Sequence, residues 1–213
     1  MSDDNERYYN ELAGSSLHRL AGLSDGIFAV AMTILVLALA VPAVGEVRND
    51  SELWHALVNL LPNVVTYFMS FLTLGIFWVG QQTQLSQLEK GNRDYTWINL
   101  AFLLFVTLLP FSTELLARFY MSRIALIAYW LNILVLGTLI LASAEYAARA
   151  GLFRKEAVEL TMRAVRRRVY IAQSLYLFAT VLCVIDTRIS IALIVLVQLN
   201  YAIAPRIAFL HRI

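Results

Sequence analysis

The sequence is poor in the residue types from which catalytic and metal sites are usually built. It has one cysteine, Cys183, so no disulfide can form within the chain. Its three histidines, His18, His55 and His211, are isolated and lack the cysteine, histidine or aspartate spacing of a metal site. The sequence also has no nucleophile–base pair and no glycine-rich phosphate loop. These absences predict a protein that is not an enzyme and that holds no cofactor or metal ion.

Charge is scarce as well. Charged residues make up 15% of the 213 residues, and the formal net charge is +2. The Lys and Arg residues are dispersed, without the aromatic-interleaved basic face of a nucleic-acid-binding protein, so no nucleic-acid partner is expected. Hydrophobic residues, in contrast, make up 60% of the chain, whereas a soluble domain has about half. They come in blocks without period-two alternation, which predicts an all-α integral membrane protein and disfavours a β-barrel.

Six apolar stretches predict six transmembrane helices. The first runs without a charge from Gly26 to Gly45, and its twenty residues would span about 30 Å, the thickness of one hydrocarbon core. The next lies within 53–88, which is long enough for a span plus a cytosolic extension. Asn49, with Asp50 and Ser51, is expected to cap this second helix, and Asp94 the third. The remaining predicted spans are 95–113, 124–144, 169–185 and 189–205, the last two forming a tight hairpin.

The charge distribution predicts one membrane domain, residues 1–213, with both termini in the cytoplasm. Its parts would include a solvated N-terminal tail, residues 1–18, and a basic cytosolic connector, residues 146–168. The connector has a charged helical pattern from 154 to 168 that continues into the fifth helix. With this orientation, thirteen Lys and Arg residues lie on the cytosolic side and four on the other. Because cytoplasmic loops carry an excess of Lys and Arg, a multi-pass protein of the plasma membrane is expected.

The motif Arg-x-x-x-Leu-Ser-Asp at residues 19–25, followed by a long apolar helix, resembles the Arg-x-x-x-Phe-Ser-Asp signature of the endosomal and lysosomal potassium channel family. The resemblance is to bacterial members with one six-helix repeat per chain, and it extends to Trp78 and to residues 99–111, which are similar to the family's third helix. Two positions depart from the pattern. Leu23 stands in place of Phe, and Gln81 stands where a Trp-x-x-His pattern would have His.

Asp25 is a carboxylate at the edge of an apolar span, where an unpaired charge is costly. Six residues turn a helix by about 600°, so Arg19 and Asp25 lie on different faces and Asp25 needs partners on other helices. One alternative is that Asp25 only caps the first helix. The resemblance implies instead a structural network that ties together the inner ends of the first three helices. Its predicted members are Arg19, Ser24, Asp25, Trp78, Gln81 and Asn99.

An apolar, branched stripe formed by Val30, Ile34, Leu37 and Val41 runs along the first helix, about 140° from Asp25, with Thr33 at its edge. Taken alone, such a stripe usually indicates packing. The resemblance implies a homotetramer in which the first helix of each subunit lines a central pore. The residues predicted to form the constriction, along which potassium would pass, are Val30, Thr33, Ile34 and Leu37.

The predicted function is passive, potassium-selective conduction, with potassium ions, the lipid bilayer and identical subunits as partners. Residues 73–77, Thr-Leu-Gly-Ile-Phe, are only faintly similar to a Thr-Val-Gly-Tyr-Gly filter, so no filter built from backbone carbonyls is expected. Gly75 is expected instead to allow a close helix contact. The alternative is a secondary transporter or proton-coupled carrier, against which stand the lack of an internal repeat and of mid-membrane ionisable groups. A scaffold without transport is a third possibility.

Overall fold

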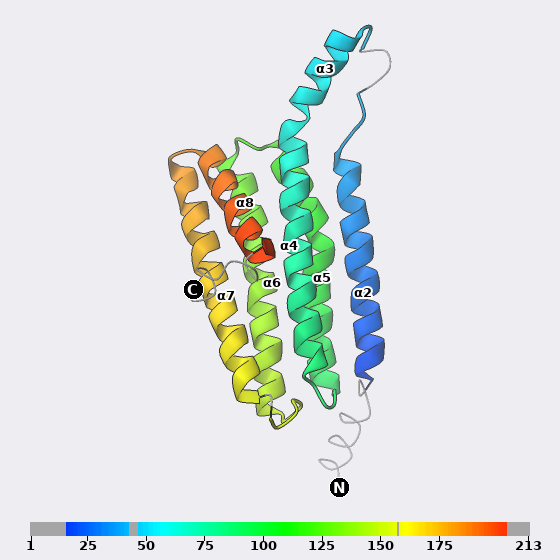
Figure 1. Ribbon diagram of the computed structural model, residues 1–213, viewed down its shortest axis with the longest axis vertical. Helices are drawn as coiled ribbons and strands as arrows, with labels where there is room; N and C mark the ends of the chain where they lie inside the picture. The colour runs from blue at the N-terminus through cyan, green and yellow to red at the C-terminus, as the bar shows by residue number, and fades with distance from the viewer. Residues whose placement is uncertain (1–15, 43–46, 157, 204–213) are drawn as a thin grey trace.

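The protein is a bundle of long helices. The computed structural model describes residues 16–42, 47–156 and 158–203, and within these ranges it has helices and no strands (Figure 1). The elements are α2 (Leu17–Ile34), the 3₁₀ helix η1 (Leu35–Ala38), α3 (Asp50–Asn59), α4 (Leu61–Ser86), α5 (Arg93–Arg118), α6 (Arg123–Arg149), α7 (Val158–Val181), the 3₁₀ helix η2 (Leu182–Val184) and α8 (Thr187–Ile203).

The long helices run antiparallel to their neighbours in sequence (Figure 1). On one flank α2 packs on α4 and α5, and on the other flank α7 packs on α6 and α8. The short helix α3 projects beyond the bundle at the end away from the N-terminus. Because α8 is short, it lies between α7 and α4 along only about half of the bundle. The arrangement leaves one whole side of α2 without a neighbour in the described chain.

The first helix begins earlier and ends earlier than predicted. It starts at Leu17, where the Ser16 hydroxyl accepts a hydrogen bond from the Arg19 amide at 3.4 Å, and it tightens into η1 after Ile34. At Leu39 the backbone (φ −89°, ψ 76°) leaves the helix. The end of the predicted tail therefore belongs to α2, while residues 1–15 lie outside the described residues. The length of the charge-free interval did not predict where this helix begins, because the helix also includes the polar residues before that interval.

The second apolar stretch is divided into α3 and α4. Asn49 caps α3 as predicted, since its side chain accepts from the Glu52 amide at 2.9 Å. The break at Leu60 is followed by Pro62 in the first turn of α4, a position that needs no backbone donor. The α3 helix thus precedes α4, at the end of the bundle from which α3 projects. That part of this stretch extends into the cytosol stays a prediction.

The cap of α5 also differs from the prediction. Asn92, in an extended conformation (φ −143°, ψ 175°), accepts from the Tyr95 amide at 2.9 Å. Asp94 lies one residue inside the helix, where its carboxylate is favourably placed in the first turn near the positive end of the helix dipole. Only a residue outside the helical φ/ψ region can turn its side chain back to the exposed amides, and this residue is Asn92.

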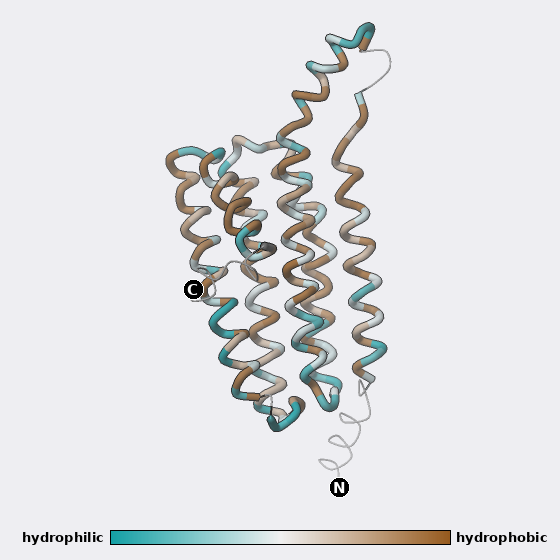
Figure 2. Tube along the Cα trace, in the orientation of Figure 1, coloured by the Kyte–Doolittle hydropathy of each residue, from teal (hydrophilic) through white to brown (hydrophobic). Residues whose placement is uncertain are grey.

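Among the described residues, four helices are long and apolar enough to cross a membrane, namely α4, α5, α6 and the continuous stretch Leu17–Ala38. The apolar helix α8 is shorter, and α7 is apolar only beyond its charged first half (Figure 2). The all-α membrane class is confirmed, whereas six spans remain a prediction. The charged pattern before residue 168 does continue without a break into the fifth long apolar segment, since α7 runs from Val158 to Val181.

Close helix contact occurs at a different glycine from the one expected. A Cβ on Gly75 would meet no atom within 4 Å, so this residue does not bring two helices together within the described chain. On α6, by contrast, a Cβ on Gly137 would overlap the amide of Gln173. That amide donates to the Ile133 carbonyl at 3.1 Å and so joins α7 to α6. Gly137 is therefore the glycine that allows two helices to approach closely.

Candidate pore-lining helix and its polar contacts

Helix α2 has one covered face and one open face. Ser24, Phe28 and Ala31 are buried against the bundle, and the Phe28 ring lies 6.1 Å from the Phe102 ring of α5. Side chains three and four residues apart share a helix face, so this spacing defines a continuous packing surface. The residues predicted to line a constriction are on the open side, where Val30 is 56%, Ile34 45% and Leu37 76% exposed. Residue 33 is exposed there as well.

The geometry of the open face departs from an ideal α-helix near its end. Leu37 lies in the 3₁₀ segment η1, where residues three apart are eclipsed, so it stands above Ile34 rather than beside it. Val41 lies beyond η1, so its predicted place on a helix wheel does not apply. The Thr33 hydroxyl donates to the Val30 carbonyl at 2.8 Å. Its hydrogen is thereby held within the helix, while its oxygen keeps a lone pair for another partner.

Asp25 joins α2 to α4. One of its carboxylate oxygens accepts from the indole Nε1 of Trp78 at 2.8 Å and from the amide of Gln82 at 2.5 Å. Because Ser16 caps the helix, the alternative in which Asp25 only caps α2 is excluded. Gln82 was missed by the sequence analysis, although its spacing of four residues from Trp78 places both on one face of α4.

A second set of contacts joins α2, α4 and α5. The Ser24 hydroxyl donates to Gln81, whose amide nitrogen donates to Asn99 Oδ1 at 3.2 Å. The Asn99 amide in turn donates to the Tyr95 carbonyl at 2.9 Å. Ser24, Gln81 and Asn99 are all buried. Gln81 can bond to Ser24 and to Asn99 at the same time because its side-chain amide, like a neutral imidazole, has both an acceptor and a donor.

Arg19 stands apart from these contacts. Its side chain is exposed, and no hydrogen bond or ion pair joins it to Asp25 or to another residue of the described ranges. Its backbone N–H donates to the Ser16 hydroxyl. Five of the six predicted network residues thus meet in two groups, Asp25 with Trp78 and Ser24 with Gln81 and Asn99. The structural role assigned to the whole set stays a prediction.

A deeper polar layer was not anticipated from the sequence. The Tyr129 hydroxyl of α6 lies 3.1 Å from that of Thr73 and accepts from Ser70 at 3.3 Å. Thr113 of α5 donates to Ser70 at 2.6 Å, and Gln198 of α8 donates to Thr73 at 2.7 Å. No local pattern could have indicated this layer, because each helix contributes one or two neutral residues to it. The layer holds together α4, α5, α6 and α8.

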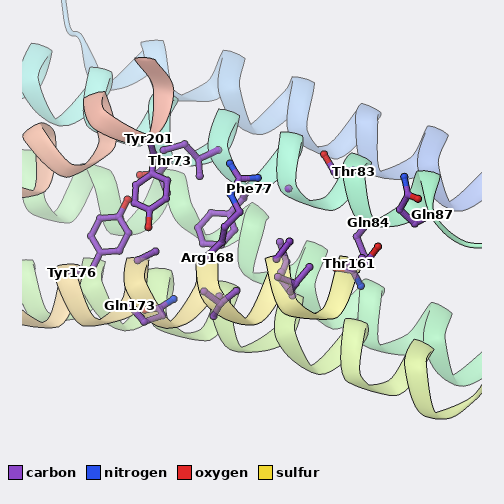
Figure 3. A pocket seen from close by; sticks show the side chains of 18 of the residues that line it. Thr73, Phe77, Thr83, Gln84, Gln87, Thr161, Arg168, Gln173, Tyr176 and Tyr201 are labelled. Carbon is purple, nitrogen blue, oxygen red and sulfur yellow. The ribbon is translucent and has the colours of Figure 1, made fainter. Parts of the chain in front are cut away.

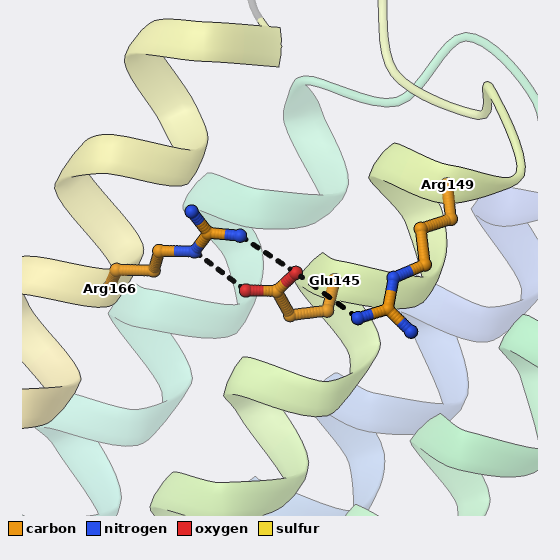
Figure 4. Close-up of polar contacts among 3 residues, drawn as sticks. All are labelled: Glu145, Arg149 and Arg166. Atoms are coloured by element: carbon orange, nitrogen blue, oxygen red, sulfur yellow. Dashed lines mark hydrogen bonds and ion pairs between the residues drawn. The ribbon is translucent and has the colours of Figure 1, made fainter.

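An ion-pair cluster joins α6 and α7 near the end of the bundle that holds the 150–157 connection (Figure 4). The Arg166 guanidinium donates twice to Glu145, at 2.6 and 2.9 Å, and Arg149 approaches the same carboxylate at 3.9 Å. The hydrogen bond and negative charge of Glu145 raise the pKa of Arg166 above its ordinary value. The paired geometry is the fork-to-carboxylate arrangement that orients Arg precisely.

The chain has recognisable relatives. Residues 19–110, which include the motif at 19–25, α4 and most of α5, match the sequence profile of the family described as endosomal/lysosomal potassium channel TMEM175. The crystal structure of a lysosomal potassium-selective channel TMEM175 homolog from Chamaesiphon minutus has the same fold, with a TM-score of 0.77 and 25% identity over 90% of this chain and 98% of that one. The chain is thus similar to the TMEM175 family in sequence over residues 19–110 and in fold over most of its length.

Two relatives show how much of the chain the comparison covers. A potassium channel from Streptomyces collinus is 36% identical over 101 residues, which are 47% of this chain and about half, 48%, of that protein. A potassium channel from Chamaesiphon minutus is 26% identical over 193 residues, which are 89% of this chain and 95% of that one. The matched family and these relatives are described as ion channels and not as enzymes, in agreement with the expectation from the sequence.

Proposed function

We propose that this chain is a member of the TMEM175 family and a potassium-selective channel that conducts passively through a pore lined by α2. Four copies would place their α2 helices around one axis, with Val30, Thr33, Ile34 and Leu37 forming the constriction. The observation that carries the proposal is the division of α2 into a buried face and an uncovered, branched apolar face. The names of the Streptomyces and Chamaesiphon relatives support potassium as the ion.

The contacts behind α2 support its role as a pore wall. Asp25 and Ser24 are bonded to α4, and Phe28 packs on α5, so the helix is held from its buried side. A helix that lines a constriction must keep its radius, because hydrophobic constrictions stop ions by losing their water when they are narrow. The open face is therefore positioned by the polar contacts, while those contacts stay away from the ion path.

Selectivity in this proposal comes from Thr33. Rings of Val30, Ile34 and Leu37 offer an ion no ligands, whereas four Thr33 oxygens, or waters that they hold, replace part of the hydration shell of potassium. Sodium binds its water more tightly and is compensated less well. The Thr33 hydrogen bond to the Val30 carbonyl orients the oxygen without consuming it. No ring of backbone carbonyls is needed, since residues 73–77 lie inside α4.

The proposal is tested by the reversal potential of the purified protein in bilayers between potassium and sodium solutions. The wild type should give a current driven by the membrane potential without a counter-substrate, whereas a carrier would saturate and couple. Thr33→Ala should lower the preference for potassium, and Ile34→Asn should raise conductance and flatten that preference because it wets the constriction. Phe28→Leu, on the buried face, is the matched control. Unchanged current and reversal potential for every open-face variant would exclude α2 as the pore wall.

We further propose that the chain crosses the plasma membrane six times with both termini in the cytoplasm. The end of the bundle with the 150–157 connection carries most Lys and Arg residues, as the cytoplasmic side does. Single cysteines at Asp50 and Glu156, in a Cys183→Ala background, would be labelled with an impermeant thiol reagent. Only the cysteine at position 50 should react in intact cells, and labelling of both from outside would refute this topology.

A further inference from the structure

A groove of about 350 Å³ lies between α4 and α7, with α6 as its floor (Figure 3). At one end it is bounded by Thr73, Tyr176 and Tyr201, and α8 ends two residues after this tyrosine. Because α8 reaches only about halfway along α7, the rest of the groove is left uncovered by the described chain (Figure 1).

The walls of the groove change in character along its length. Apolar side chains line most of it, among them Phe77, Val169 and Ala172. Polar side chains gather at the end nearer the 150–157 connection, where Thr83, Gln84, Gln87 and Thr161 lie together (Figure 3). A ligand that fits both parts must be amphipathic, with an apolar chain and a polar head.

Arg168 lies beside Phe77 in the apolar part, and it is the charged residue among those that line the groove (Figure 3). Two other basic residues of α7 are paired with carboxylates, Arg163 with Glu159 and Arg166 with Glu145. Arg168 has no hydrogen bond or ion pair with any residue of the described ranges, and its side chain is exposed. A guanidinium next to an apolar wall favours an anion, above all a phosphate that accepts two of its hydrogen bonds.

Gln84 is part of the polar end of the groove but is itself buried. Its side chain is 2% exposed, and its amide nitrogen donates to Ser143 at 2.8 Å. The polar side chains that remain accessible at this end are Thr83, Gln87 and Thr161. Hydroxyl and amide groups of this kind suit the polar head of a ligand.

We infer that the groove binds an anionic phospholipid, such as phosphatidylglycerol, from the adjoining leaflet. Its phosphate lies against Arg168, its head group extends toward the polar end of the groove, and one acyl chain follows Phe77, Val169 and Ala172. Residues 204–213 directly follow α8 and are the rival occupant. Their basic residues, Arg206 and Arg212, would bring like charge to Arg168, which favours the lipid. The inference does not depend on conduction.

The test compares binding of phosphatidylglycerol and of phosphatidylcholine with the same acyl chains to the full chain in detergent, by native mass spectrometry. The wild type should prefer phosphatidylglycerol about fivefold, the effect of one basic residue near an anionic head group. Arg168→Gln should bind both lipids equally. Arg163→Gln removes the same charge from the same helix but outside the groove, and it should keep the preference. Ala164→Trp, which fills the groove from an exposed position, should weaken binding of both lipids.

Three results would overturn the inference. If Arg168→Gln keeps the preference, the phosphate lies elsewhere, and if Arg163→Gln loses it equally, only the general basic surface attracts the lipid. If the wild type binds neither lipid while eluting as a folded species, another part of the assembly fills the groove. Elution profiles of the variants must match the wild type, so that weaker binding is not a result of misfolding.

Discussion

The two polar layers of the bundle differ in charge and in exposure. The layer toward the end of α4 contains the carboxylate of Asp25, which is exposed and bonded to Trp78 and Gln82. The deeper layer around Tyr129 is wholly neutral, and none of its five members is more than 1% exposed. A charge at the centre of a membrane helix costs about 2.5–3.5 kcal/mol or more, whereas neutral groups that bond across helices are tolerated. The charged contact is thus found where the side chain is exposed, and the neutral contacts are found where the side chains are buried.

The layers also join different helices. Asp25, Ser24 and their partners attach α2 to α4 and α5, while the deeper layer attaches α8 and α6 to the same two helices. Helices α4 and α5 thus form the common support for both flanks. Loss of the deeper layer should loosen the whole bundle, and loss of the outer layer should loosen chiefly α2, the proposed pore wall.

The largest effect is expected for Tyr129→Ala. This change removes a fully buried ring together with the hydroxyl that meets Ser70 and Thr73, so it should lower the free energy of unfolding by about 3–5 kcal/mol. Titration with a denaturing detergent, followed by circular dichroism, measures the loss. Tyr129→Phe keeps the ring and should cost only about 0.6 kcal/mol. Equal losses for the two variants would mean that the hydroxyl, not the packing, stabilises the layer.

An intermediate effect is expected for Asp25→Ala. The change leaves the Trp78 indole and the Gln82 amide without their acceptor, and bonds to a charged group are worth about 1.5–3 kcal/mol. The exposure of Asp25 places the expected loss at the lower end, and the same detergent titration measures it. Asp25→Asn keeps an acceptor oxygen and should lose less. A change of reversal potential in a stable Asp25→Ala protein would instead make Asp25 a pore residue.

The smallest effect is expected for Arg166→Gln, which breaks the exposed pair with Glu145 between α6 and α7. Exposed pairs contribute little and are screened by salt, so the shift in the unfolding midpoint should be below that of Asp25→Ala and should vanish at high salt. Arg163→Gln is the control, since its partner Glu159 is on the same helix. A shift that persists in high salt would show that Arg166 stabilises the protein by packing rather than by charge.

Local signals predicted the elements well where one residue decides the structure. Asn49 was correctly predicted to cap α3, because an amide before an acidic first turn is a strong local signal. Asp94 was the wrong choice for α5, since Asn92 two residues earlier has the extended backbone that a cap requires. The start of α2 was missed because a charge-free interval measures hydrophobicity, whereas the helix continues through Ser24 and Asp25 to its cap at Ser16.

The candidate site was predictable in part. The motif at residues 19–25 pointed to Ser24 and Asp25, and the descent of the second helix placed Trp78 and Gln81 near them, as the structure does. Gln82 and the layer around Tyr129 were not found. Single neutral residues have no periodic signal, and their partners lie far away in the chain.

The sequence by itself determined that this is a helical membrane protein and which family it resembles, because apolar blocks and a short motif are properties of contiguous residues. Only the tertiary structure decided which polar side chains meet. Gln198 reaches Thr73 across 125 residues of sequence, and Asp25 reaches Gln82 across 57. Such contacts depend on the rotation and axial position of each helix against its neighbours. These are set by packing of all the helices together, and no single stretch of residues contains them.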